Sequence, residues 1–282
     1  MTSPEQYAPA AHYDRVTAAW GLLLGAELHY GYFATGQEQL PVATRALTTQ
    51  MLEAAQLRAG LRVLDVGCGT GEPARRLARE FGVEVLGITT SEVGVATATE
   101  ITQAEGVDGV RFEVRDGTDN RLPAASFDRA WVMESSHLMP DRPALLRECA
   151  RVLAPGGRLV LCDIIRRREI PFAELRQRRH AFAVLRAAFG AARMDSLDQY
   201  ARYAVDAGLV DVVTRDITAE TLPTFDRWQA NLDEHRDRVV ELIGEQGAAD
   251  FEESVRILRD FWLDGTLGYG LVTAVQGSGA PA

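Results

Sequence analysis

The chain has 282 residues, of which 46% are hydrophobic and 25% charged, so it can bury a sizeable core and is unlike a disordered chain. Its formal net charge of −10 provides no broad attraction to a phosphate backbone, so nucleic acid is not expected as a substrate. All 30 basic residues are arginine, and without lysine neither a Walker A phosphate loop nor a pyridoxal phosphate Schiff base can form.

The location of the protein is inferred from what its sequence lacks. No apolar run approaches the roughly 18 residues that cross a membrane, and the first residues lack a signal pattern of basic followed by apolar residues. The three cysteines, at positions 68, 149 and 162, have no CxxC spacing, so neither a zinc site nor a disulfide framework is expected. The sequence therefore predicts a metal-independent cytoplasmic protein without a membrane partner, and its arginine bias favours a bacterial source.

Residues 1–57 are predicted to form an N-terminal helical lid. From His12 to Leu57, helical spacing is interrupted by an aromatic, glycine-containing segment, LHYGYF at 28–33, which indicates helix, loop and helix. Residues 58–282 are then expected to form the binding domain, with helical inserts at about 166–195 and 222–263.

From Arg62 onwards, short β-branched runs alternate with amphipathic helical stretches, as is typical of βαβ units and a parallel sheet. The predicted strands are Arg62–Val66, Val83–Ile88, Val110–Val114, Phe127–Met133, Arg158–Ile165, 211–217 and 269–275. The helices that alternate with them are predicted at 72–81, 91–105, 141–153 and 196–207. The fold class is therefore α/β, with a Rossmann-like, seven-stranded and mostly parallel sheet covered by helices on both faces.

The most specific signal is VLDVGCGTG at 63–71, a buried strand running into a glycine turn that opens a helix. Glycine permits a sharp turn whose N–H groups face a ligand. A dinucleotide loop would need glycine at position 72, where the acid Glu72 would repel a pyrophosphate. Asp65 suits a ligand with positive charge, and S-adenosylmethionine (SAM) carries an ammonium and a sulfonium. SAM is therefore the predicted cofactor, and a nicotinamide or flavin site and a ligand-free turn are the alternatives.

This glycine segment resembles motif I of class I SAM-dependent methyltransferases, and the order of elements over 60–165 is similar to that fold throughout. Three further segments, LHYGYF at 28–33, MESSHLMPDR at 133–142 and LAPGGRLVLCDI at 153–164, resemble bacterial natural-product methyltransferases of the rebeccamycin sugar O-methyltransferase type. Sterol and geranyl diphosphate C-methyltransferases are more distantly similar. The resemblance covers most of the chain and is strongest over 28–165.

The resemblance implies a cofactor-binding set drawn from the lid and from several strand ends: Tyr13, His29, Asp65, Gly67, Gly69, Thr89, Thr90, Asp116, Gly117 and Met133. Within it, Asp65 and the glycine turn hold the methionine part of SAM, Asp116 with Gly117 meets the adenine, and the lid residues cover the cofactor. One position departs from the pattern, because Thr89-Thr90-Ser91 stands where many relatives have an acid that grips the ribose. Asp116 also has a purely structural alternative, as the cap of a turn.

Two candidate catalytic residues lie at the ends of neighbouring predicted strands, His137 after the fourth and Asp163 at the end of the fifth. Methyl transfer is an in-line displacement that chiefly needs alignment in a dry pocket, but a hydroxyl acceptor gains from a base. His137 and Asp163 lie where open α/β sheets bind ligands, and the resemblance places its catalytic His and Asp at both positions. His137 is the predicted general base, with Asp163 orienting it or acting as a second base. The alternatives are that His137 caps a turn and that Asp163 only ends a strand.

Two further features leave alternatives open. The arginine-rich segment 166–179 either clamps a diphosphate or forms a solvated helix face, and the aromatic residues of the two inserts either line the acceptor pocket or fill the core. A cyclopropane-forming lipid enzyme is disfavoured, because LHYG stands at 28–31 where those enzymes carry a cysteine-containing stretch.

The predicted function is SAM-dependent methylation of a small secondary metabolite, preferably on oxygen. C- or N-methylation, a SAM-binding cyclase and a SAM-binding regulatory protein are the alternatives. The identity of the acceptor stays open, and so does the oligomeric state, for which a homodimer is one arrangement.

Overall fold

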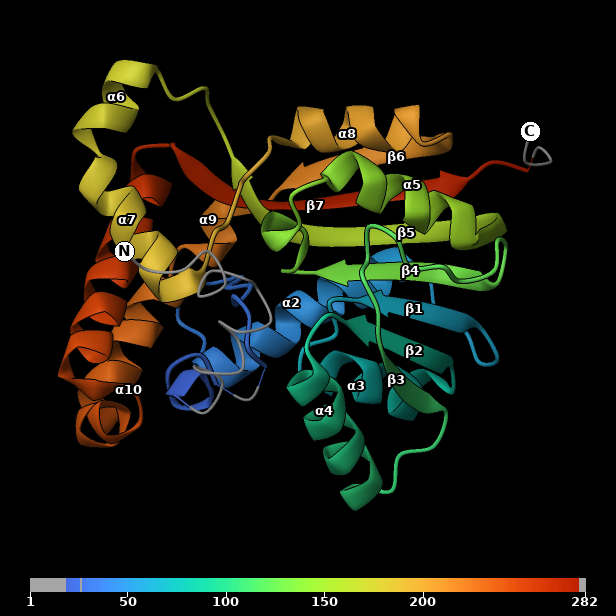
Figure 1. The fold of residues 1–282 in the computed structure, drawn as a ribbon, viewed down its shortest axis with the longest axis horizontal. Helices are drawn as coiled ribbons and strands as arrows, with labels where there is room; N and C mark the ends of the chain where they lie inside the picture. Colours follow the sequence, from blue (N-terminus) through green and yellow to red (C-terminus); the bar gives the residue numbers. More distant parts are fainter. Residues whose placement is uncertain (1–18, 26, 279–282) are drawn as a thin grey trace. The chain divides into compact units, whose positions relative to one another are not determined.

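The computed structural model describes residues 19–25 and 27–278, and its strands form one seven-stranded sheet in the order β3-β2-β1-β4-β5-β7-β6 (Figure 1). The strands are β1 (Arg62–Val66), β2 (Glu84–Thr89), β3 (Val110–Val114), β4 (Phe127–Met133), β5 (Leu153–Arg166), β6 (Leu209–Asp216) and β7 (Leu267–Gln276). The pairs β1–β2, β1–β4, β2–β3 and β4–β5 are parallel, whereas β6 and β7 are antiparallel. The predicted α/β fold with a mostly parallel seven-stranded sheet is confirmed.

The helices of the described residues alternate with the strands, and some of them begin at a capping side chain. They are α2 (Leu40–Ala55), α3 (Glu72–Phe81), α4 (Glu92–Ala104), η2 (Ser136–Leu138), α5 (Arg142–Val152), α6 (Phe172–Gln177), α7 (Arg179–Phe189), α8 (Leu197–Asp206), α9 (Thr218–Thr221) and α10 (Thr224–Leu263). Before α4, the Ser91 hydroxyl accepts a hydrogen bond from the Gly94 N–H at 2.8 Å, and before α5 the Asp141 carboxylate accepts from the Ala144 N–H at 2.8 Å. The side chains that close these helix starts therefore position the strand-to-helix turns.

The bounds of several elements differ from the sequence prediction, most of all at the start of β5. Strand β5 begins at Leu153 rather than Arg158, because Leu153 pairs with Phe127 across an irregular register that accommodates Pro155-Gly156-Gly157. The insert predicted as helical over 222–263 is one element, α10, that bends at His235 and Gly244, where the backbone is not helical. Gly244 has φ +77°, a conformation that glycine adopts without strain.

The described residues group into two compact units. One contains described residues of 19–47, 164–194 and 217–269, and the other contains 48–163, 195–216 and 270–278. In the first unit, Tyr30 stacks on Trp262 with ring centroids 5.4 Å apart, and Trp228 packs edge-on against Tyr30 at 4.8 Å. In the second, Leu64, Leu86 and Trp131 are fully buried around the sheet. The assignment of residues 1–57 as a lid stays a prediction.

Candidate active site

The glycine turn after β1 has no room for side chains at two positions. Gly67 has φ +82°, and a Cβ there would lie 2.2 Å from the Cβ of Ser135. Gly71 has φ +80°, and a Cβ there would lie 2.4 Å from the ring of Phe112. The Ser135 hydroxyl also donates a hydrogen bond to the Val66 carbonyl at 2.7 Å, which ties the end of β4 to the end of β1. Both the backbone conformation and the packing therefore require glycine here.

Asp65 is a buried carboxylate at this turn, and one of its oxygens has no hydrogen-bond partner among the described residues. Its side chain lies in β1 with the residue only 2% exposed, and Oδ2 accepts no hydrogen bond from the described residues. Burial raises its pKa to about 7. An unpaired charge in the interior is unfavourable, so the site fits a ligand whose positive group completes the pairing. The nearby Gly69, with φ +53° and open space beside its α-carbon, leaves room on the ligand side.

The hydroxyls after β2 are only partly available for a ribose. Ser91 is buried, and its hydroxyl caps α4. The N–H of Ser91 donates to Thr89 Oγ1 at 3.3 Å. Thr89 is half-buried and Thr90 is exposed. Among the three hydroxyls, those of the two threonines are the ones left at the end of β2 to contact a ligand.

Asp116 caps the turn that follows β3. Its Oδ1 accepts hydrogen bonds from the N–H of Thr118 at 2.8 Å and from the hydroxyl of Thr118 at 2.7 Å. The structural alternative for Asp116 is thus present in the fold, and its contact with adenine stays a prediction. The adjacent Gly117 is buried so closely against β1 that a Cβ would lie 2.6 Å from Val66 Cγ1. Met133, the last residue of β4, is buried as well.

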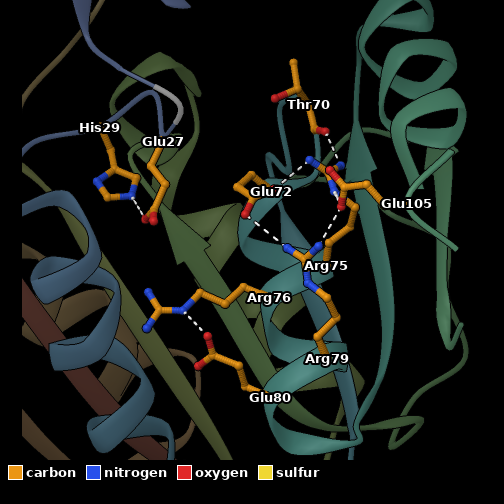
Figure 2. A network of polar contacts seen from close by, with 9 residues as sticks. All are labelled: Glu27, His29, Thr70, Glu72, Arg75, Arg76, Arg79, Glu80 and Glu105. Atoms are coloured by element: carbon orange, nitrogen blue, oxygen red, sulfur yellow. Dashed lines mark hydrogen bonds and ion pairs between the residues drawn. The ribbon is translucent and has the colours of Figure 1, made fainter. Parts of the chain in front are cut away.

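The two predicted lid residues have different outcomes. Tyr13 lies outside the described residues. His29 is buried in the first compact unit, where its Nε2 lies 2.9 Å from Glu27 Oε2 (Figure 2). Its Nδ1 lies 2.8 Å from the Tyr30 carbonyl oxygen. Because a carbonyl only accepts, Nδ1 carries the hydrogen. Both ring nitrogens of His29 are therefore engaged within its own unit.

The structure brings the two candidate catalytic residues into direct contact. His137 lies in η2 directly after β4, and its Nδ1 is 2.6 Å from Oδ1 of Asp163 in the neighbouring strand β5. The His137 N–H donates to Oδ2 of the same carboxylate at 3.0 Å. Asp163 is fully buried, whereas His137 is 7% exposed and its Nε2 makes no hydrogen bond to the described residues. Nε2 is thus the nitrogen left for a substrate.

The electrostatics of this pair favour the charged forms. Burial lowers the pKa of His137, but the charge of Asp163 and its hydrogen bond outweigh burial, so the pKa is raised above its ordinary value. Burial raises the pKa of Asp163, but His137 and the other donors to this carboxylate bring it below its usual value. The imidazolium and the carboxylate therefore stabilise each other, and His137 can accept a proton at Nε2 with its charge balanced.

Sequence reasoning missed two members of this cluster. The Ser136 hydroxyl donates to Asp163 Oδ2 and lies 2.7 Å from the hydroxyl of Tyr200 in α8. Both Ser136 and Tyr200 are fully buried. Ser136 is adjacent to His137 and could have been suspected from that position. Tyr200 lies 64 residues further along the chain, and no spacing rule links it to the site.

The side chain of Arg75 stabilises the glycine turn. The buried guanidinium donates to the Thr70 carbonyl at 2.8 Å and to Glu72 at 2.8 Å, and forms an ion pair with Glu105 at 3.1 Å (Figure 2). Arg79 binds the same two carboxylates. Two arginines therefore compensate the charge of Glu72, so a dinucleotide loop is disfavoured by the missing glycine at 72 rather than by repulsion from Glu72.

At least three of the arginines in 166–179 are paired within the first compact unit, and one of these pairs is Arg166 with Glu169. Arg168 binds Glu174 through two contacts of 2.8 and 2.6 Å, and Arg178 binds Asp264 at 2.7 Å while its guanidinium lies over the Phe261 ring. These pairs favour the surface alternative over a diphosphate clamp. Most of the insert aromatics are core residues, namely Phe225, Trp228, Phe261 and Trp262, whereas Phe172 is 75% exposed.

A hollow of about 520 Å³ lies along α10, and its lining includes the insert aromatic Phe225 but none of the predicted catalytic or cofactor-binding residues. Across it, Arg259 forms an ion pair with Asp226 at 3.1 Å. Within residues 19–25 and 27–278, no helix is long and apolar enough to cross a membrane. The same residues contain no group of three or more His, Cys, Asp and Glu side chains that could hold a metal ion.

Comparisons with known proteins relate this arrangement to a family. The protein-family model described as "Mycolic acid cyclopropane synthetase" matches residues 2–267 of this chain. The 27-O-demethylrifamycin SV methyltransferase of Amycolatopsis mediterranei (strain S699) is 36% identical over 275 residues, which cover 97% of this chain and 98% of that protein. The crystal structure of the [4+2]-cyclase SpnF is 28% identical, with a TM-score of 0.81 and 96% of both chains covered. Mycolic acid cyclopropane synthase CmaA1, complexed with SAH and CTAB, has the same fold at 19% identity, with a TM-score of 0.85 and 97% and 99% covered.

Proposed function

The chain belongs to the mycolic acid cyclopropane synthetase family and is a SAM-dependent methyltransferase, and on this premise we propose that it methylates a hydroxyl oxygen of a small secondary metabolite. The observation that carries the choice of oxygen is the His137–Asp163 pair, joined at 2.6 Å, with Nε2 left for a substrate. A hydroxyl must lose its proton as the new bond forms, and a positioned imidazole serves that step. An amine or a reactive carbon has less need of such a base.

The residues of the glycine turn fit the cofactor. Bound SAM supplies an electrophilic methyl group on a sulfonium. The carboxylate of Asp65, buried and with Oδ2 unpaired among the described residues, would accept the ammonium of the methionine part. The methionine carboxylate would lie against the turn at Gly69, because the N–H of Gly67 already donates to the Ile88 carbonyl at 2.8 Å. Thr89 and Thr90 would contact the ribose, Asp116 and Gly117 the adenine, and Met133 would line the strand end beneath them. His29 and Tyr13 would act from the lid.

In the proposed reaction, His137 moves one proton. Its Nδ1–H stays bonded to Asp163 while Nε2 takes the proton of the acceptor hydroxyl. The acceptor oxygen gains the methyl group, the sulfonium becomes a neutral thioether, and the proton passes later from Nε2 to solvent. Asp163 stabilises the imidazolium throughout, because its charge is buried within hydrogen-bond distance.

The acceptor class is inferred from a relative with a similar length. The name of the rifamycin methyltransferase describes an acceptor that lacks a methyl group on oxygen, and this chain matches it over nearly all of both proteins. We extend that class to this chain as a hydroxylated natural product. We further propose a cytoplasmic enzyme without a nucleic-acid partner, since the net charge of −10 disfavours binding to phosphate backbones, and a homodimer as its assembly.

One other function is favoured by a specific observation, the likeness to the [4+2]-cyclase. A [4+2] ring closure forms two carbon–carbon bonds and transfers no proton to a base. The buried His137–Asp163 pair would then have no chemical task, which is why methylation of oxygen is preferred.

The experiment is transfer of labelled methyl from SAM to a panel of hydroxylated natural products by the wild type and by His137→Ala. We expect turnover to fall by about 10²–10⁴, the range for loss of a positioned acid–base group, with SAM affinity nearly intact. His180→Ala is the matched control, since this exposed histidine pairs only with Glu253 in the described structure. Near-normal turnover in His137→Ala would replace the proposal with N- or C-methylation, and ring closure without methyl transfer would replace it with the cyclase.

A further inference from the structure

The carboxylate of Asp163 is held by more than the histidine. Its Oδ1 contacts His137 Nδ1, and its Oδ2 accepts hydrogen bonds from the His137 N–H and from the Ser136 hydroxyl. All of these groups are buried, and Asp163 itself is fully enclosed. A buried carboxylate keeps its charge only when donors of this kind compensate the lost hydration.

The direction of the next hydrogen bond follows from a count of protons. A serine hydroxyl has one hydrogen, and the ionised carboxylate of Asp163 can only accept, so the Ser136 hydrogen points to Asp163. The Tyr200 hydroxyl, 2.7 Å from Ser136 Oγ, must then donate to that oxygen. Burial and the charge of Asp163 raise the pKa of Tyr200 well above its usual value, so this hydroxyl keeps its hydrogen.

We propose that Ser136 and Tyr200 are positioning residues that disperse the charge of Asp163 and thereby keep the proton affinity of His137 low enough for it to act as a base near neutral pH. Tyr200 acts only through Ser136, because its hydroxyl donates to Ser136 Oγ. The claim about turnover rests on the proposed function, whereas the claim about the titration of His137 does not.

The sign of the effect follows from the charge distribution. A donor to Oδ2 withdraws negative charge from the carboxylate, and the imidazolium of His137 is then stabilised less. Without the Ser136 hydroxyl the carboxylate pulls harder on the imidazolium, so His137 holds its proton to a higher pH. Among the described residues, the other charged groups whose effect on His137 or Tyr200 is resolved are Glu134, Arg142 and Asp195. The variants below leave these three groups in place.

The test is the titration of His137 followed by NMR in the full-length protein labelled in its histidine rings, with the signal assigned by its loss in His137→Gln. The chain has five histidines, so the spectrum is simple. The variants are Ser136→Ala, Ser136→Cys, Tyr200→Phe and the double variant Ser136→Ala with Tyr200→Phe. Tyr203→Phe is the matched control, because Tyr203 lies on the same helix and bonds Asp195 at 3.2 Å instead of Ser136.

We expect the midpoint of His137 to rise by roughly half to one pH unit in Ser136→Ala, since a hydrogen bond to a charged group is lost. The rise should be smaller in Tyr200→Phe and intermediate in Ser136→Cys, whose thiol is a weak donor. The double variant should match Ser136→Ala, and Tyr203→Phe should match the wild type. Turnover at pH 7 in Ser136→Ala should fall by about 3- to 10-fold and recover at higher pH.

Two results would overturn the proposal. One is an unchanged or lowered midpoint of His137 in Ser136→Ala. The other is that Tyr200→Phe shifts this midpoint by the same amount in the wild type and in the Ser136→Ala background. Tyr200→Phe keeps the ring and removes one oxygen, so it decides the matter even where Ser136→Ala fails to fold. If the midpoints of His137 move as expected but turnover does not follow them, the positioning role of Ser136 and Tyr200 is supported and the general-base role of His137 is contradicted.

Discussion

Gly67 and Ser135 lie in such close contact that a single added carbon on Gly67 would be 2.2 Å from the serine Cβ. This contact joins the turn after β1 to the end of β4, the two segments that carry the candidate cofactor and catalytic residues. The close approach of these two segments therefore requires glycine at position 67.

Gly67→Ala is expected to reduce SAM affinity by at least about tenfold, because both the positive φ and the contact with Ser135 force the turn to move. Calorimetric titration with SAM and with its demethylated product measures the effect. Gly60→Ala is the control, since Gly60 has φ +80° but nothing within 4 Å of the added carbon. Equal affinity in Gly67→Ala and the wild type would refute the placement of the cofactor at this turn.

Asp65 should make SAM binding depend on pH. Its pKa of about 7 in the free protein means that the carboxylate is protonated at lower pH, so affinity should fall by up to about tenfold per unit below pH 7 and level off above it. Calorimetry from pH 5 to 9 measures this curve. A flat curve, or Asp65→Asn with undiminished affinity, would show that this carboxylate does not meet the ammonium.

The same residue should make the free protein less stable as pH rises. The pKa of Asp65 is raised by burial from its usual value of 3.8 to about 7 on folding, so the folded state binds this proton more tightly than the unfolded state. The resulting stabilisation is present below about pH 4, declines as pH rises to about 7, and amounts to at most roughly 4 kcal/mol. Asp65→Asn should therefore raise the melting temperature at pH 8 and leave it nearly unchanged at pH 4.

Turnover should rise with pH through the titration of His137. Because Asp163 keeps the pKa of His137 above its ordinary value, the imidazole is charged at mildly acidic pH and becomes able to accept a proton only as pH rises. Rates at saturating SAM between pH 5.5 and 9.5 should follow one ionisation above the usual histidine range. In Asp163→Asn the pairing charge is lost, so the midpoint should move to lower pH while the maximal rate falls.

Activity is expected to be independent of metal ions, because SAM methyl transfer needs alignment and, for a hydroxyl, a base. Assays after treatment with a chelator should give the rate of the untreated enzyme. Loss of activity that a divalent ion restores would show that a metal takes part.

The parts of the fold that depend on local pattern were predictable, and the parts that depend on long-range contacts were not. The strands over 62–66, 110–114 and 127–133 matched, since β-branched runs bounded by turns define them. The predicted start of β5 was wrong, because Pro155-Gly156-Gly157 indicates a turn unless the pairing across an irregular register is known. His137 and Asp163 could be paired from adjacent strand ends. Tyr200 could not be assigned to the site from the sequence, because its contact with Ser136 depends on the tertiary packing of α8.

Arg75 has a consequence for the way the cofactor enters. Its guanidinium fastens the carbonyl of Thr70 to Glu72 and to Glu105 at the end of α4, so the loop is held in its bent shape by side chains of the protein itself. A ligand that meets such a rigid loop loses little of its binding energy to chain ordering. Association with SAM should therefore occur in a single kinetic phase whose rate increases in proportion to ligand concentration, without the plateau that a slow rearrangement would impose.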